Sequence, residues 1–98
     1  MTLEEIRQSI AERVGRATDL NASVKFIVDG DKIVHVDATQ QPPLITTEDK
    51  PADCTVRVSA ETFSDILAGR TSAAMAYMFG KIKIEGSMSV AMAINRIL

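Results

Sequence analysis

The one histidine and the one cysteine of this chain are the side chains best suited to catalysis. His35 and Asp37 lie two residues apart, so on a strand they share a face, where a hydrogen bond could orient the imidazole as a general base. The sequence has no Gly-x-Ser-x-Gly motif, and Cys54 has no His or Lys next to it that would activate its thiol. We therefore interpret the His35 and Asp37 pair as solvated surface and Cys54 as a small buried apolar residue, and we expect no enzymatic activity.

Metal, phosphate and nucleic-acid sites are not indicated either. One His and one Cys cannot supply the three or four ligands of a zinc site. Gly80-Lys81 is a fragment of a phosphate-loop motif, but Met75 replaces its first Gly and Ile82 its Ser or Thr. A net charge of −2 without a basic run argues against a nucleic-acid partner. We expect no metal and no cofactor; Lys81 and Lys83, on the polar face of a strand, are either solvated or close to a ligand's head group.

Four of the five methionines gather toward the end of the sequence with one phenylalanine, as Met75, Met78, Phe79, Met88 and Met92. Flexible, polarizable thioether side chains suit a cavity that accepts apolar ligands of different shapes. They also fill an ordinary hydrophobic core, and the spacing alone favours this second role. Because only 4% of the residues are aromatic, the core must consist mainly of aliphatic side chains and methionine.

The length of 98 residues predicts one domain over 1–98, which starts with a helix and a hairpin. A capping box at Thr2 and Glu5, followed by apolar residues three and four apart, predicts a helix over about 3–17. Alternating apolar and polar residues on both sides of Asp29-Gly30-Asp31 predict the hairpin.

The register of this hairpin depends on the length of its loop. A two-residue loop pairs residues whose numbers have an odd sum and places Phe26 on the same face as His35. A three-residue loop gives even sums and instead groups Phe26 with Val34 and Val36. The second register separates apolar from polar side chains better, so we favour it, and it turns His35 and Asp37 toward solvent.

Three further strands are predicted. Residues 44–46 follow Pro43 and can form only an edge strand. The strands that start at Cys54 and Ile82 alternate apolar with polar residues, so each has one face that is exposed to water. Helices should therefore cover only one side of the sheet.

Three further helices are predicted, from Ser59 to Gly69, over 73–79 after a cap at Thr71 or Ser72, and over 87–98. The last is apolar nearly all round, so it should be buried on more than one side. The fold class is thus α/β (α+β), a mixed sheet with helices on one face.

No membrane-spanning segment is expected, because the longest apolar run, 73–79, is far shorter than the roughly 18 residues that a spanning helix needs. The start of the sequence has no basic and apolar signal-peptide pattern. The lone cysteine cannot form an internal disulfide, so we expect a cytoplasmic protein.

From Ala52 to Met92 the sequence resembles the sterol carrier protein type two family of lipid-binding domains. The N-terminal half matches that family only in the order of its elements. The motifs that carry the resemblance are an Ala52-Asp53-Cys54 strand, a helix with Ser59, Phe63 and Gly69 at its start, centre and end, Gly80-Lys81 before an alternating strand, Gly86, and Ala91-Met92.

The resemblance implies a small stand-alone, sterol carrier protein-like domain, in which a five-stranded mixed sheet and the helices on one face enclose an apolar tunnel. The family usually has an acidic or amide residue where this sequence has Ser87, and a Lys where it has Ala93. Many members continue with a segment that closes the tunnel, whereas this sequence stops at Leu98. We expect the tunnel to be open at this end or closed by a partner.

The resemblance also implies the function. We expect a non-enzymatic carrier that binds and transfers a sterol, a fatty acid, an acyl-CoA or another long apolar ligand. The alternative is an accessory module that homodimerises through its last helix or presents a lipid precursor in a biosynthetic complex. The residues expected to contact the ligand are Phe26, Val56, Phe63, Leu67, Met75, Met78, Phe79, Ile82, Met88 and Met92.

Overall fold

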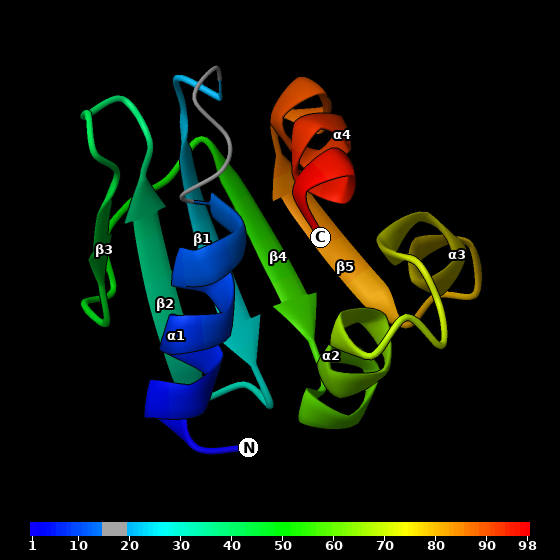
Figure 1. The fold of residues 1–98 in the computed structure, drawn as a ribbon. Helices are drawn as coiled ribbons and strands as arrows, with labels where there is room; N and C mark the ends of the chain where they lie inside the picture. Colours follow the sequence, from blue (N-terminus) through cyan, green and yellow to red (C-terminus); the bar gives the residue numbers. More distant parts are fainter. Residues whose placement is uncertain (15–19) are drawn as a thin grey trace.

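The computed structural model describes residues 1–14 and 20–98, which form two layers, with the helices on one side of a sheet (Figure 1). The order of the elements is the one that the sequence predicts, while residues 15–17 of the first predicted helix lie outside the described residues. The elements are α1 (Leu3–Val14), β1 (Ser23–Val28), β2 (Lys32–Asp37), β3 (Leu44–Thr46), β4 (Cys54–Val58), α2 (Ala60–Leu67), α3 (Ala73–Met78), β5 (Ile82–Gly86) and α4 (Met88–Ile97).

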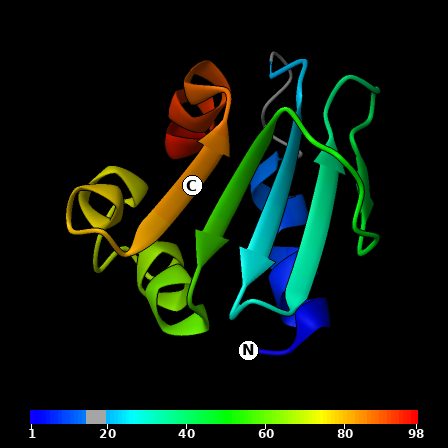
Figure 2. The same ribbon diagram turned by 180° about the vertical axis from the view of Figure 1, so that it is seen from behind.

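The five strands form one mixed sheet in the order β3-β2-β1-β4-β5. Only β1 and β4 run parallel, and the other neighbours are antiparallel. Seen from behind, the sheet has no helix across it (Figure 2). The predicted fold class and the expectation that helices cover one face are thereby confirmed.

The hairpin of β1 and β2 has the register that the apolar pattern favours. Phe26 pairs with Val34 and Val24 with Val36, so the paired numbers have an even sum and the loop has three residues, 29–31. Gly30, with φ of 78°, takes a backbone conformation that side chains rarely adopt, which is why this position suits glycine. The apolar face of the hairpin is completely buried, as expected.

The expectation that His35 faces solvent is wrong. Its side chain is 6% exposed, and its Nε2–H donates a hydrogen bond to the carbonyl oxygen of Pro51 at 3.0 Å. On the same face, Lys25 Nζ lies 2.8 Å from Asp49 Oδ1. The physical reason is topological: β3 lies beyond β2, whereas β4 lies beyond β1, so the β3–β4 connection has to pass behind both strands and covers their polar face (Figure 2).

The hydrophobic core lies between the sheet and the helices. The apolar stripe predicted for the first helix, Ile6, Ile10 and Val14, is buried, and α1 packs against β2 and β3. At its last turn Arg13 donates to the carbonyl oxygen of Leu67 at 3.2 Å, which joins α1 to the end of α2. Two helices of the same layer are thus held together by a polar contact.

Serine side chains begin the three C-terminal helices. Ser59, Ser72 and Ser87 each accept a hydrogen bond from a backbone N–H of the first turn. Two of these caps were expected from the sequence, and Ser72 is the one used of the two candidates before α3. The caps fix where α2, α3 and α4 start relative to the sheet.

Cys54 is fully buried on the apolar face of β4, and burial raises the pKa of its thiol. We expect a thiol reagent to label it far more slowly in the native protein than in denaturant; labelling at the rate of a free thiol would place β4 in the opposite register.

Burial of the Cys54 thiol also makes the free energy of unfolding depend on pH, with a defined sign. Above the ordinary thiol pKa of about 8.5, the unfolded chain releases a proton that the folded chain retains. Stability should therefore be highest below this pH and fall as the pH rises, and Cys54→Ala should remove that part of the slope.

Among the glycines that the structure describes, Gly86 is the one whose replacement should cost most. It has φ of 95°, and a Cβ there would lie 2.4 Å from the carbonyl oxygen of Asp53. Gly69, with φ of 78°, would meet no atom within 4 Å. Gly69→Ala is therefore expected to cost about 1–2 kcal/mol from backbone strain, and Gly86→Ala at least about 1–2 kcal/mol more from the clash. Chemical denaturation of both variants measures the difference, and equal losses would contradict the close approach of β5 to Asp53.

Candidate functional site

The structure divides the ten predicted ligand contacts into two groups. In the first group Phe26, Val56, Phe63 and Ile82 are buried in the core, and Leu67 is half-buried at the end of α2. In the second group all five side chains are exposed, namely Met75, Met78, Phe79, Met88 and Met92. The candidate site is therefore the region where the core passes into the surface of α3 and α4.

α3 turns one narrow face toward the core. Ala76 is completely buried, whereas Met75 and Tyr77 on either side of it are 46% and 45% exposed. Met78 lies two residues beyond Ala76, about 200° further around the helix, and is 79% exposed. Met78 therefore points away from the core, and Phe79, which caps the helix, is also largely exposed.

The expectation that α4 is buried on more than one side is wrong. Ala91 and Ile94 are buried where α4 packs against β4 and β5, but Met88 and Met92 are 48% and 68% exposed. The reason is that the helices form a single layer, so nothing described in the structure covers the outer side of α4 (Figure 1).

A hydrogen bond joins α4 to α3. The side-chain oxygen of Asn95 accepts from the backbone N–H of Ala74 at 2.9 Å, in the first turn of α3. Met88, Met92 and Asn95 are spaced by four and three residues, so they share one face of α4. The two methionines thus lie along the face through which α4 reaches α3. Asn95 was not among the predicted residues, although it is one of the few polar residues in an apolar helix.

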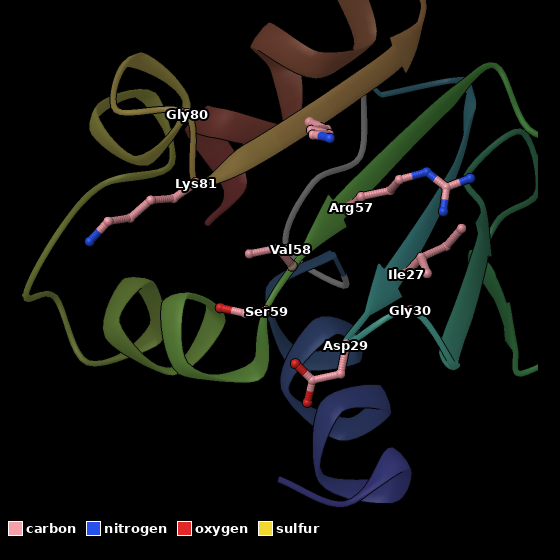
Figure 3. Close-up of a pocket in the computed structure, with 9 residues that line it drawn as sticks. Ile27, Asp29, Gly30, Arg57, Val58, Ser59, Gly80 and Lys81 are labelled. Atoms are coloured by element: carbon pink, nitrogen blue, oxygen red, sulfur yellow. The ribbon is translucent and has the colours of Figure 1, made fainter.

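A hollow of about 300 Å³ lies on the helix-free side of the sheet, at the end of β4 and the start of β5 (Figure 3). It has a basic character that the sequence did not reveal, because it combines Arg57 of β4 with Lys81, directly before β5, and Lys83 of β5. Figure 3 shows the side chains of Arg57 and Lys81 extending in opposite directions, so the hollow is open and broad. Its lining residues are Ile27, Asp29, Gly30, Arg57, Val58, Ser59, Gly80, Lys81 and Lys83.

The charges around this hollow are only partly compensated. Arg57 Nε lies 3.4 Å from Glu85 Oε1, whereas neither Lys81 nor Lys83 has an ion-pair partner among residues 1–14 and 20–98. The carboxylate of Asp29 is engaged, because one oxygen accepts from the Ala60 N–H at 2.8 Å and the other lies 3.8 Å from Lys32 Nζ. The rim of the hollow therefore carries two lysines that have no ion-pair partner among the described residues.

The described part of the chain contains neither a long apolar helix nor a cluster of metal-ligating side chains. No helix there has the length and apolar character needed to cross a membrane. No three of the described His, Cys, Asp and Glu side chains are grouped as a metal site would require.

The sequence of this chain matches the SCP-2 sterol transfer family over residues 3–98. A curated relative, non-specific lipid-transfer protein-like 1 of Caenorhabditis elegans, is 26% identical over 100 residues, covering 97% of this chain and 85% of the relative. The crystal structure of sterol carrier protein 2 like 2 from Aedes aegypti has a TM-score of 0.73 at 22% identity, covering 97% of this chain and 94% of that one. The palmitated form of that mosquito protein gives a TM-score of 0.71 at 24% identity, with 99% and 94% coverage.

Two more distant structures share the fold. A sec-alkylsulfatase from a Pseudomonas species has a TM-score of 0.71 at 17% identity, and all of this chain matches 16% of that enzyme. The UbiJ-SCP2 ubiquinone synthesis protein has a TM-score of 0.64 at 14% identity, covering 97% of this chain and 90% of that one. The fold thus occurs both alone and as a small part of a large enzyme. Because the family match extends over nearly the whole chain and the fold is shared with solved sterol carrier protein 2-like structures, the chain belongs to the SCP-2 sterol transfer family.

Proposed function

We propose that this protein is a non-enzymatic carrier that binds a lipid with a long apolar chain, such as a fatty acid, against α3 and α4. The observation that carries the proposal is the exposure of Met75, Met88 and Met92 beside a core with few aromatic side chains. Leaving large apolar side chains in water contributes nothing to the stability of the fold. Their exposure is explained if an apolar ligand covers them.

The ten residues predicted from the sequence are the proposed contacts, in two roles. Met75, Met88 and Met92 form the sides of the site, and Met78 and Phe79 form its outer rim. The residues Phe26, Val56, Phe63, Leu67 and Ile82 form the inner wall, which an apolar tunnel would reach when the ligand is bound. Covering each half-exposed methionine contributes about 1 kcal/mol to binding, and burial of the ligand's own chain adds about 0.8 kcal/mol for each CH₂ group.

Family membership supports the same proposal. The mosquito relative with this fold has been solved in a palmitated form, and the nematode relative is named as a lipid-transfer protein. The pattern of an apolar site without a nucleophile and base is that of a binding protein. We place the carrier in the cytoplasm, where the buried free thiol of Cys54 would remain reduced.

A second candidate is an accessory module that dimerises through α4 or presents a lipid precursor in a biosynthetic complex. The exposed Met88 and Met92 favour it, because an apolar helix face also fits a protein partner. The fold shared with a ubiquinone synthesis protein is compatible with this role. In this case the same face would be covered by protein rather than by lipid.

Native mass spectrometry after mild purification distinguishes the two candidates. A carrier should be recovered with an added lipid mass, and the delipidated protein should take up palmitate at a stoichiometry of about one. An accessory module should show no lipid mass and should be found as a dimer or in a complex. A monomer that binds neither palmitate nor a sterol would rule out the proposed carrier function.

A further inference from the structure

The α3–β5 corner, which we define as Met78, Phe79, Lys81 and Lys83, combines the two most exposed large apolar side chains with two unpaired lysines. Met78 is 79% and Phe79 71% exposed, more than any other large apolar residue described. The corner lies where α3 turns into β5 at the edge of the sheet (Figure 1). Side chains as exposed as these, at the outer rim of the proposed site, cover little of a ligand, so the corner calls for a further role.

Charge is distributed unevenly along the chain. Residues 1–67 contain seven basic and twelve acidic side chains, whereas residues 68–98 contain four basic and one acidic. The protein is acidic overall, with a net charge of −2, yet the part that carries the corner is basic. Such asymmetry indicates a surface that meets a negatively charged partner.

The basic hollow lies directly beside the corner. Lys81 and Lys83 belong to both, and Arg57 pairs with Lys83 across β4 and β5. Figure 3 shows Lys81 at the start of β5, extending from the rim of the hollow. Because neither lysine has an acidic partner in the described chain, both ammonium groups are available to phosphate groups.

We infer that the α3–β5 corner docks on the surface of an anionic phospholipid bilayer. Met78 and Phe79 enter the boundary between head groups and acyl chains, while Lys81, Lys83 and Arg57 contact the lipid phosphates. A second copy of the chain fits less well, because a two-fold contact through this corner would place its lysines against the same lysines of the partner. The inference rests on the proposed function, since a carrier has to collect its ligand from a bilayer.

Sedimentation with vesicles tests the inference on the intact chain. The protein should bind vesicles of phosphatidylcholine mixed with phosphatidylserine, bind vesicles of phosphatidylcholine alone weakly, and be released by salt. Each lysine near an anionic surface contributes about a fivefold factor, so the double variant Lys81→Glu, Lys83→Glu should bind at least about twentyfold more weakly. Phe79→Ser should weaken binding about tenfold by loss of apolar burial.

Two control variants lie outside the corner. Lys50→Glu changes a half-exposed lysine of the β3–β4 connection, which pairs with Glu48, and Leu44→Ser changes an exposed apolar residue of β3 at the opposite edge of the sheet. Both variants should bind like the parent protein. Equal losses in these controls would overturn the inference. A dimer that Phe79→Ser dissolves, without any vesicle binding, would also overturn it in favour of a second copy.

Titration with palmitate in the absence of vesicles separates this inference from the proposed function. A protein that binds palmitate but not anionic vesicles would overturn the docking surface and leave the carrier function intact. A protein that binds the vesicles but not palmitate would support the docking surface and refute the carrier function.

Discussion

Met92→Lys is expected to fold with the stability of the parent protein and to bind palmitate at least about tenfold more weakly. Met92 is 68% exposed, so the ammonium group of a lysine there reaches water in the ligand-free protein. A ligand chain laid along the Met88 and Met92 face of α4 would cover this group. Covering an unpaired charge costs several kcal/mol. If the ammonium group keeps part of its contact with water, the remaining cost still exceeds the 1.4 kcal/mol that corresponds to a tenfold loss of affinity.

Thermal unfolding and titration with a fluorescent fatty acid measure the two effects separately. Leu44→Lys is the matched control, because Leu44 of β3 is an exposed apolar residue, 43% exposed, at the opposite edge of the sheet. The control should bind like the parent. Full affinity in Met92→Lys would exclude this face of α4 as the site, and a joint loss of fold and binding would show that Met92 belongs to the packed core.

The register of the hairpin could be predicted from the sequence because it depends on local information. A shift of one residue would move every apolar side chain of β1 to the polar face. Gly30 indicates a three-residue loop, and a loop of this length fixes the observed register. The same holds for the serine caps and for glycines such as Gly69 that end helices. These features need only a few neighbouring residues to be specified.

The burial of His35 could not be predicted in this way. The alternation of β2 makes its polar face look solvated, and this would be correct for an isolated hairpin. What covers His35 is Pro51, sixteen residues further along the chain, and its position follows from the strand order rather than from the sequence of β2. A pattern in one strand contains no information about a connection that passes behind it.

In the candidate site the sequence pattern overestimates burial, whereas for His35 it underestimates burial. The sequence identifies the apolar residues of α3 and α4, but periodicity cannot say whether a second layer covers them. α4 is apolar nearly all round, yet it buries Ala91 and Ile94 and leaves Met88 and Met92 exposed, because the helices form one layer. Arg57 likewise acquires significance only when β4 and β5 place it next to Lys83.

The three phenylalanines offer one substitution in two environments, the buried core and the exposed surface. Phe26 and Phe63 are each 1% exposed, so Phe26→Ala and Phe63→Ala should each cost about 3–5 kcal/mol through lost burial and the cavity left behind. Domains of this size have a total stability of about 5–15 kcal/mol, so the melting temperature should fall by more than about 10 °C. Phe79→Ala should change the stability by no more than about 0.5 kcal/mol, because Phe79 is 71% exposed. Denaturant titration of the three variants compares them directly. A loss in Phe79→Ala as large as that in Phe63→Ala would mean that this ring packs in solution, which would remove the apolar part of the α3–β5 corner.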